Sequence, residues 1–270
     1  MTSSDCVHNR DSVLFLFAHN DDEFFVLPQL EREVAAGHRV VCVYTTDGAA
    51  YGESPKRRLD ESLSVLCPRG VAAQDIIPLG DQIGVRDGVS HRSIELLWER
   101  LSVAFGGQRF SRIYIPAWEG GHADHDAAHL LGVALARSQA AEAVEFSLYH
   151  SYRAIKPLIR CMSLIPFPGN ITHTKVSLGG ALSWIFEARN FPSQRRAFLG
   201  LLPFCLPQIL MRRSLPLRVV EHRNYRQRPH EGRLFYEIRF KVPYEEFFSA
   251  TASFIDRTVD PPKSLDARAS

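Results

Sequence analysis

Two short clusters of histidine and aspartate contain the residue types of a catalytic metal site. The first lies in AHNDDE (residues 18–23), directly after the apolar run VLFLF, and the second lies in HADHD (residues 122–126). Catalytic zinc commonly takes three protein ligands from histidine and carboxylate and keeps a further position for water, whose pKa falls to roughly 7. One histidine and one aspartate of the first cluster, with one histidine of the second, would supply these ligands. The other aspartate of the first cluster would then be free to take a proton from the water.

A simpler interpretation exists for each cluster alone. An aspartate before a helix is an ordinary N-cap, and a single histidine is more often a hydrogen-bonded surface or core residue than a metal ligand. Both clusters, however, occur where a predicted strand gives way to a predicted helix. This coincidence favours a joint site over two unrelated turns.

The elements that would position the clusters alternate along the first part of the chain. Apolar runs predict strands at residues 13–17, 40–45, 112–116 and 144–149. Helical periodicity predicts amphipathic helices at residues 57–66, 93–105 and 125–136. Such alternation is typical of an α/β fold, in which helices cover a parallel sheet. Ligands of these sheets bind outside the carboxyl ends of the strands, which is where both clusters lie.

The chain changes character after about residue 150. Prolines interrupt its apolar segments, and the runs at residues 216–222 and 233–240 alternate like half-exposed strands. We therefore expect one domain over residues 1–270, with a core at about 11–150 and an irregular C-terminal elaboration at about 151–260.

Composition limits the partners and the compartment. The net charge of +2 gives no general electrostatic case for nucleic acid, so we expect no nucleic-acid partner. Five cysteines without a CxxC pair indicate a reducing compartment. The first residues lack a basic stretch followed by an apolar one, and the apolar run at 197–211 is short and contains two prolines. We expect a cytoplasmic protein and leave peripheral contact with a membrane open; the sequence makes no prediction about oligomeric state.

The two clusters together resemble the paired signature of the LmbE-like (PIG-L) zinc deacetylases, whose members show AHPDDE and HPDH. AHNDDE and HADH stand at the corresponding places, and FPSQ at residues 191–194 is similar to a late YxSQ segment of that family. The resemblance implies a Rossmann-like, mostly parallel sheet with helices on both faces. It also implies a Zn2+ cofactor and removal of an N-acetyl group from an amino sugar, such as a GlcNAc-type unit of a glycan, glycolipid or glycoside precursor.

The resemblance also implies a role for each residue of the clusters. The zinc ligands would be His19, Asp22 and His125, and Asp21 would be the general base. His122 would stand near the developing oxyanion and, as an imidazolium, stabilise it or protonate the leaving amine. Asp124 would orient a neighbouring histidine. Asn20 and Ala123 replace prolines of the signature, and because neither position supplies a ligand we expect the chemistry to survive.

The predicted substrate-binding residues are Arg57, Arg58 and Asp81. Either arginine could hold a substrate hydroxyl or phosphate, and a solvated helix start is an equally good interpretation of the pair. Asp81 in LGD and Asp87 in RDG each resemble a sugar-contacting acid of the family, and spacing does not choose between them. We expect His129, one helical turn beyond the second cluster, to pack or to support a ligand and not to bind metal.

Ten arginines and only two acids occur between Arg189 and Arg233, beside the apolar stretch FLGLLPFCLPQILM. This composition would suit a lipid-linked or nucleotide-linked sugar phosphate, or contact with anionic lipid. The alternative is a solvated face around a packed helix pair, and we slightly favour that interpretation.

An alternative function is a Rossmann-like sugar- or nucleotide-binding protein, or a transferase, without metal hydrolysis. A GxGxxG segment after the first strand would favour it. The chain has HNDDEF there, and its acids would repel a diphosphate. The sequence therefore favours the hydrolase.

Overall fold

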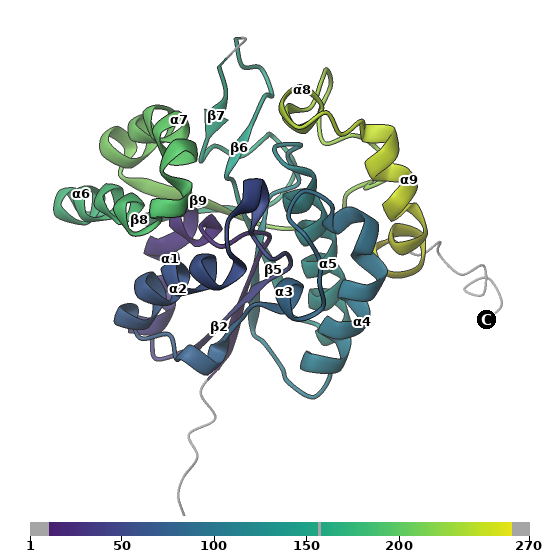
Figure 1. The fold of residues 1–270 in the computed structure, drawn as a ribbon, viewed down its shortest axis with the longest axis horizontal. Coiled ribbons are helices and arrows are strands. Elements are labelled where there is room, and N and C mark those ends of the chain that lie inside the picture. Colours follow the sequence, from purple (N-terminus) through teal and green to yellow (C-terminus); the bar gives the residue numbers. More distant parts are fainter. Residues whose placement is uncertain (1–10, 156–157, 261–270) are drawn as a thin grey trace, which may run out of the picture.

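A seven-stranded sheet forms the centre of the molecule in the computed structural model, which describes residues 11–155 and 158–260. The strand order is β3-β2-β1-β4-β5-β9-β8 (Figure 1). The bounds are β1 Ser12–Phe17, β2 Arg39–Tyr44, β3 Ile76–Ile77, β4 Arg112–Pro116, β5 Glu142–Phe146, β8 Ile171–Lys175 and β9 Ser214–Val219. Strands β1 to β5 are parallel, whereas β9 is antiparallel to both β5 and β8. The predicted α/β class with a mostly parallel sheet is confirmed.

Strand β1 shows why the apolar runs become central strands. Its side chains point alternately to the two faces of the sheet. Val13, Phe15 and Phe17 enter one hydrophobic core, and Leu14 and Leu16 enter the other. All five are fully buried, which explains the continuous apolar run, because a strand covered on both faces has no polar side.

Helices cover both faces of the sheet (Figure 1). One core includes side chains of α1 Leu27–Ala35, α2 Pro55–Leu66, α6 Leu178–Glu187 and α7 Arg195–Leu206. The opposite core includes side chains of α3 Leu79–Gln82, α4 Ile94–Phe105, α5 Ala123–Gln139, α8 Phe235–Arg239 and α9 Tyr244–Phe254. Among the described residues, no helix has the length and apolar character needed to span a bilayer.

Short elements connect this framework. The single-turn helices are η1 Asp22–Val26, η2 Ala50–Gly52, η3 Cys67–Arg69, η4 Ala73–Asp75, η5 Ser90–Ser93, η6 Ala188–Asn190 and η7 Pro192–Gln194. The segments η8 Pro207–Arg212 and η9 Ile255–Val259 have π-helical hydrogen bonding. A separate hairpin consists of β6 Tyr149–His150 and β7 Arg160–Cys161.

Helix α5 is not amphipathic, contrary to the prediction for residues 125–136. Every residue from Ala123 to Ala136 is buried, because the helix packs on β4 with one side and against α4 and η9 with others. Its approach to the sheet is close: a Cβ on Gly132 would lie 2.2 Å from Cγ2 of Ile115. The helix that carries the second cluster is therefore held rigidly from several directions.

The two predicted late strands have different outcomes. Residues 214–219 form β9, but this strand is buried and not half-exposed, because it lies between β5 and β8 in the sheet. The prediction of a strand at residues 233–240 is wrong, since Phe235–Arg239 form α8. Glu237 accepts a hydrogen bond from the backbone N–H of Leu234 at 2.7 Å, which stabilises the first turn of this helix.

Candidate active site

A cavity of about 430 Å³ opens at the carboxyl ends of the parallel strands. The loop after β1, the start of α5 and the start of α2 meet in its wall. The predicted residues that line it are His19, Asp21, Asp22, Arg58, His122 and His125. The structure thus brings the two clusters together, as expected for strands that end at one edge of a sheet.

The three predicted metal ligands form a compact group. Nε2 of His125 lies 3.2 Å from Oδ1 of Asp22, and Nδ1 of His19 lies 3.7 Å from the same oxygen. One donor atom from each of the three residues lies within 4.8 Å of the others. Two imidazoles and one carboxylate at this spacing suit a divalent metal ion.

Backbone hydrogen bonds fix the Asp22 carboxylate. Its Oδ2 accepts from the N–H groups of Ala18 and His19, each at 2.9 Å, which leaves Oδ1 facing His125. Burial alone would raise the pKa of Asp22, but His125 and His19 hold it well below its usual range. The carboxylate is therefore ionised, as a metal ligand must be.

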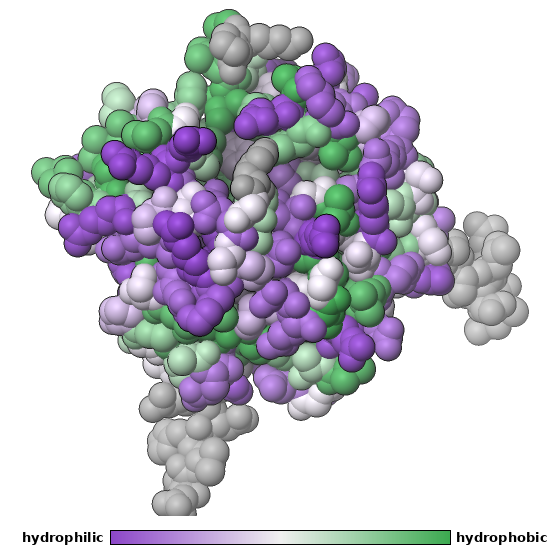
Figure 2. All heavy atoms as spheres, viewed as in Figure 1, coloured by the Kyte–Doolittle hydropathy of each residue, from purple (hydrophilic) through white to green (hydrophobic). Residues whose placement is uncertain are grey.

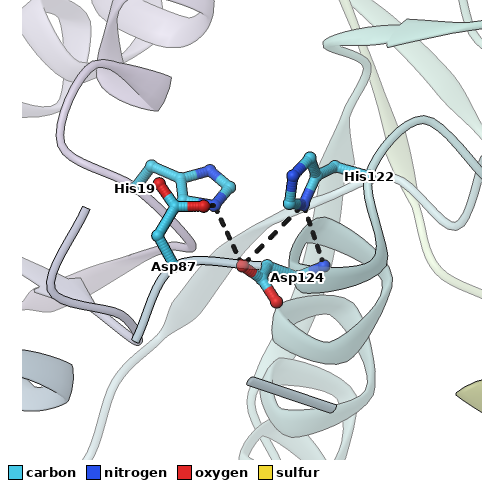
Figure 3. Close-up of side chains that lie close together, drawn as sticks. All are labelled: His19, Asp87, His122 and Asp124. Carbon is cyan, nitrogen blue, oxygen red and sulfur yellow. Dashed lines mark hydrogen bonds and ion pairs between the residues drawn. The ribbon is translucent and has the colours of Figure 1, made fainter. Parts of the chain in front are cut away.

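The opposite nitrogen of His19 meets two further carboxylates (Figure 3). Nε2 lies 3.1 Å from Oδ2 of Asp124 and 3.3 Å from Oδ1 of Asp87. Burial alone would lower the pKa of His19, but Asp87, Asp124 and Asp22 raise it well above its ordinary value. A buried site with this much negative charge favours a bound cation, whether a proton or a metal ion.

Asp124 is held at the start of α5 by the loop that precedes η5. Gly88 donates its backbone N–H to Oδ2 at 2.5 Å, and Ser90 donates to Oδ1 from its backbone at 2.9 Å and its hydroxyl at 2.8 Å. Burial opposes ionisation, but the hydrogen bond with His19 and the charge of His122 keep the pKa of Asp124 below its usual range. Asp124 can therefore fix the ring of His19, as carboxylates behind metal-binding histidines do.

His122 is the N-cap of α5. Its Nδ1 accepts the backbone N–H of Asp124 at 3.1 Å, so a neutral ring carries its proton on Nε2. Burial lowers the pKa of His122 to about 4, against the opposing influence of Asp124. The ring also packs edge-on against Phe240, with the centroids 4.3 Å apart. At neutral pH this geometry favours a neutral hydrogen-bond donor over the imidazolium suggested by the sequence.

Asp21 and Arg58 form the charged pair of the cavity wall. Oδ1 of Asp21 lies 3.3 Å from a terminal nitrogen of Arg58. Burial raises the pKa of Asp21 to about 6, and Arg58 opposes this rise. Asp21 also has a backbone φ of 129°, a strained conformation for a residue other than glycine. A carboxylate with a pKa of about 6 is suited to accept a proton near neutral pH.

Arg58 is itself fixed from the loop after β2 and from the FPSQ segment. Its Nε donates to the carbonyl of Gly48 at 2.8 Å, and a terminal nitrogen donates to Oγ of Ser193 at 3.2 Å. Gln194 of the same segment lines the cavity. The FPSQ segment therefore contributes both to the position of Arg58 and to the cavity wall.

Asn20, which replaces a proline of the signature, has a structural partner in α2. The residue is buried, and its Nδ2 donates to Oγ of Ser62 at 3.2 Å. This hydrogen bond ties the loop after β1 to the helix that carries Arg58. Ala123, the other replacement, is the first residue of α5 and is buried in the core.

Two of the predicted substrate-binding residues lie outside the cavity lining. Arg57 is half-exposed and pairs with Glu53 and Glu61, because its position on α2 faces away from the cavity that Arg58 lines. Asp81 is exposed on α3 and lies outside the cavity lining, whereas Asp87 lines the cavity. Sequence spacing left this choice open, and the course of the loop decides it.

His129 does not join the metal group. Its Nδ1 donates to the carbonyl of Pro116 at 2.8 Å, and its Nε2 accepts from the hydroxyl of Tyr225 at 2.9 Å. Burial lowers its pKa to about 3. The residue is a neutral packing histidine, as expected.

Several cavity residues have no counterpart among the predictions. They are mostly aromatic or cationic and include Tyr149, Arg196, Phe235, Arg239 and Phe240. Tyr149 packs edge-on against His125, with the centroids 5.4 Å apart. Arg196 belongs to the arginine-rich stretch, which was the one available signal. The segment at residues 233–240, which was predicted to be a strand, supplies Phe235, Arg239 and Phe240. Its alternating pattern gave no indication of the helix that it forms.

Comparison with known protein families gave a match, which spans both clusters. Residues 14–136 match the family model of PIG-L, described as GlcNAc-PI de-N-acetylase, which confirms the resemblance noted in the sequence. No curated protein sequence matches the chain significantly.

Solved structures share the fold. A triple mutant of the deacetylase of teicoplanin biosynthesis has a TM-score of 0.59 at 15% identity, over 78% of this chain and 100% of its own. The A40926 pseudoaglycone deacetylase has a TM-score of 0.57 at 15% identity, over 80% and 100%. The N,N'-diacetylchitobiose deacetylase of Pyrococcus horikoshii has a TM-score of 0.52 at 16% identity, over 78% and 84%. At such identities these likenesses establish the fold.

Proposed function

We propose that the protein is a metal-dependent N-deacetylase of an amino sugar, because residues 14–136 match the PIG-L family model. The observation that carries the proposal is the meeting of His19, Asp22 and His125 beside Asp21 in one cavity. The solved structures with the same fold include a deacetylase in complex with teicoplanin and an N,N'-diacetylchitobiose deacetylase. A GlcNAc-type unit is accordingly the proposed substrate.

The donor set fits a divalent metal, for which we propose zinc. His19, Asp22 and His125 would hold it, with Asp124 fixing the ring of His19 from behind. When bound, such a metal supplies a Lewis acid for the acyl carbonyl and lowers the pKa of its water toward neutrality.

The side chains divide the proton transfers. Asp21 takes a proton from the attacking water while the water oxygen forms a bond to the acyl carbon. The same proton passes to the amine nitrogen when the C–N bond breaks, which releases acetate and the free amine. Arg58, 3.3 Å from Asp21, opposes protonation of this carboxylate before the reaction begins.

His122 stabilises the negative charge that develops on the carbonyl oxygen. Because its Nδ1 accepts from the backbone of Asp124, its Nε2–H is the donor available to the cavity. A neutral donor of this kind stabilises an oxyanion without transferring its proton. Its removal is expected to cost about two orders of magnitude in rate.

The outer cavity wall would hold the rest of the substrate. Phe235 and Phe240 offer apolar faces for a sugar ring, and Arg196 and Arg239 offer guanidinium groups for hydroxyl or phosphate oxygens. This combination suits an amino sugar that carries a further group, such as a lipid-linked or nucleotide-linked phosphate. We therefore include a lipid-linked or nucleotide-linked phosphate on the sugar in the proposed substrate.

The test is release of acetate and of a primary amine from GlcNAc-containing substrates by protein loaded with zinc. Asp21→Asn should lose at least about a hundredfold in rate while retaining its metal. Asp81→Asn, a carboxylate of the exposed helix α3, is the matched control and should retain full activity. Full activity of Asp21→Asn would refute the mechanism. A protein that binds no transition metal and releases no acetate would instead favour a sugar- or nucleotide-binding function.

A further inference from the structure

Positive charge is concentrated in residues 146–220. This segment contains ten lysines and arginines and a single acid, Glu187, whereas the rest of the chain holds 22 basic and 29 acidic residues. The small net charge of the whole chain therefore conceals a strongly basic segment beside an acidic remainder. Such asymmetry indicates an interaction with a negatively charged surface.

Apart from Arg218, which is buried and paired with Glu145, the arginines of this segment are available to a partner. Those with exposed side chains are Arg153, Arg160, Arg189, Arg195, Arg196, Arg212 and Arg213. Within residues 11–155 and 158–260, none of these seven forms an ion pair. By contrast, Arg226, Arg228 and Arg257, later in the chain, each pair with a carboxylate. The basic segment is thus not neutralised by its own fold.

The same segment exposes most of the large apolar side chains at the surface. Of the ten that are exposed among the described residues, eight belong to it: Ile155, Leu158, Ile171, Leu178, Leu182, Phe186, Leu199 and Met211. The exposed fractions of Phe186, Leu199 and Met211 are 62%, 66% and 80%. The two outside it are Leu96 and Val103. Single exposed apolar residues are ordinary, but this concentration is not.

Helix α6 organises part of this surface. Leu178, Leu182 and Phe186 follow one another at four-residue spacing and so share one side of the helix. Its other side is anchored, because Ala181 and Trp184 are buried in the core and Trp184 donates to the carbonyl of Phe24 at 2.6 Å. The outward stripe is therefore a fixed feature of the folded chain.

Segment η8 packs against both α6 and α7, and η8 and α7 expose further apolar side chains. Segment η8 carries Met211, and α7 carries Leu199. We call the exposed side chains Leu178, Leu182, Phe186, Leu199 and Met211, with Arg189, Arg195, Arg212 and Arg213, the α6–α7 surface. Hydrophobic and hydrophilic atoms alternate over these helices in Figure 2, at the left of the view.

The α6–α7 surface adjoins the cavity. Ala197, Gly200, Leu201 and Phe204 of α7 line the cavity, while Leu199 of the same helix is exposed. Any partner on this surface would therefore lie next to the route into the active site.

We propose that the α6–α7 surface docks on an anionic lipid bilayer. The apolar side chains enter the boundary between headgroups and acyl chains, and the arginines lie among the anionic headgroups. Each arginine near such a surface strengthens binding by a factor of about five. Docking would hold the cavity beside the membrane without any spanning helix.

A second copy of the chain fits this surface less well. A symmetric dimer would place the same patch on both partners, so that the unpaired arginines of one copy would face those of the other. Like charges brought together in this way oppose association. The anionic bilayer offers the complementary charge that a second α6–α7 surface lacks.

The test is co-sedimentation of the intact protein with phosphatidylcholine vesicles, with or without about one-third phosphatidylglycerol. The proposal expects retention on the anionic vesicles, at least tenfold weaker retention on neutral ones, and a decline as salt is raised. The double variant Leu182→Glu with Phe186→Glu should reduce binding at least tenfold. Val103→Glu, at a residue 78% exposed on α4, is the matched control and should bind like the unmodified protein.

A second pair of variants separates charge from apolar contact. Arg189→Gln with Arg195→Gln should reduce binding about 25-fold, from about fivefold at each position, and unfolding temperatures should confirm that all variants are folded. Absence of binding to anionic vesicles would overturn the proposal, as would equal loss in Val103→Glu. Self-association that the double glutamate variant abolishes, without vesicle binding, would assign the surface to a second copy and likewise overturn it.

Discussion

The guanidinium of Arg58 lies 3.3 Å from the carboxylate of Asp21, in the wall of the cavity. Its other contacts, to the carbonyl of Gly48 and the hydroxyl of Ser193, leave it little freedom to move away. This contact opposes the rise in the pKa of Asp21 that burial causes, and the balance gives a value of about 6. The pH dependence of the enzyme should therefore report on this pair.

Arg58→Gln should move the acidic limb of the kcat/KM profile to higher pH. The proposed base works when deprotonated, so activity is lost as pH falls through its pKa. Removal of the nearby positive charge raises that pKa, by at least about one unit. The measurement is acetate release from pH 5 to 9. Arg57→Gln, on the outward side of the same helix, should leave the profile unchanged, and Arg58→Lys should restore part of it. Identical profiles for Arg58→Gln and Arg57→Gln would contradict the role.

Removal of metal should abolish activity and its return should restore it. Chelation followed by dialysis is expected to leave folded, inactive protein, and added zinc should recover acetate release. His125→Ala should lower metal content most, and Asp124→Asn should weaken metal affinity by about 10- to 100-fold, because Asp124 only fixes the ring of His19. His173→Ala, at an exposed histidine of β8, is the control. Unchanged metal content in His125→Ala would exclude the proposed ligand set.

Gly48 and Asn20 should be coupled in stability. Gly48 has a φ of +59°, and a Cβ there would lie 2.9 Å from Oδ1 of Asn20. Gly84→Ala is the control, because Gly84 has a similar φ of +73° and an added Cβ would contact nothing. We expect this variant to lose only about 1 kcal/mol, the cost of placing alanine in a left-handed backbone conformation. We expect Gly48→Ala to lower the free energy of unfolding by about 1 kcal/mol more than this control, because of the contact.

Asn20→Ala should relieve that additional cost. Denaturant unfolding of the two single variants and the double variant gives the coupling energy directly. Equal effects of Gly48→Ala and Gly84→Ala, or strict additivity with Asn20→Ala, would show that the contact has no energetic weight.

The buried carboxylate of Glu145 should stabilise the fold in a pH-dependent way. Arg223 donates to both its oxygens at 2.9 Å, and Nε of Arg218 donates at 2.6 Å. Burial alone would raise its pKa, but Arg223, His129 and Arg218 lower it to about 2 from an ordinary 4.5. Its contribution is therefore present above about pH 4.5 and declines as pH falls toward 2.

Glu145→Gln should cost about 3–5 kcal/mol at neutral pH, since it leaves buried cations without a counter-charge. The difference from the unmodified protein should shrink below pH 4.5. Glu142→Gln, at an exposed position of the same strand, is the control. A difference that is constant from pH 3 to 7 would contradict the assignment.

The sequence predicted the meeting of the clusters because strand ends share one edge of a parallel sheet. Continuous apolar runs located β1 and β4, and the polar residues that follow them had to converge at that edge. The same reasoning could not predict which of Arg57 and Arg58 lines the cavity. Both open the same helix, and the direction each faces depends on how α2 packs on the sheet.

Other features depend on contacts between distant segments. Helix α5 is buried on all sides partly because η9 packs against it. The residues of α5 alone give no indication of this contact. The sequence could not distinguish Asp87 from Asp81 as a cavity residue. Asp81 lies on α3 outside the cavity lining, whereas the loop between α3 and η5 brings Asp87 into the cavity wall. The alternation of residues 233–240 suggested a strand, whereas Glu237 and the buried Tyr236 stabilise a short helix.

The antiparallel pair β9 and β8 protects the sheet from aggregation. Without it, β5 would be an edge strand with unpaired backbone groups and buried apolar side chains such as Val144 and Phe146. The actual edges are the two-residue strand β3 and the largely exposed β8, which ends in Lys175. Short and charged edges resist pairing with other chains. A chain that ended before Ser214 would present β5 as a template for intermolecular sheets, so the C-terminal elaboration also covers an edge at which other chains could pair.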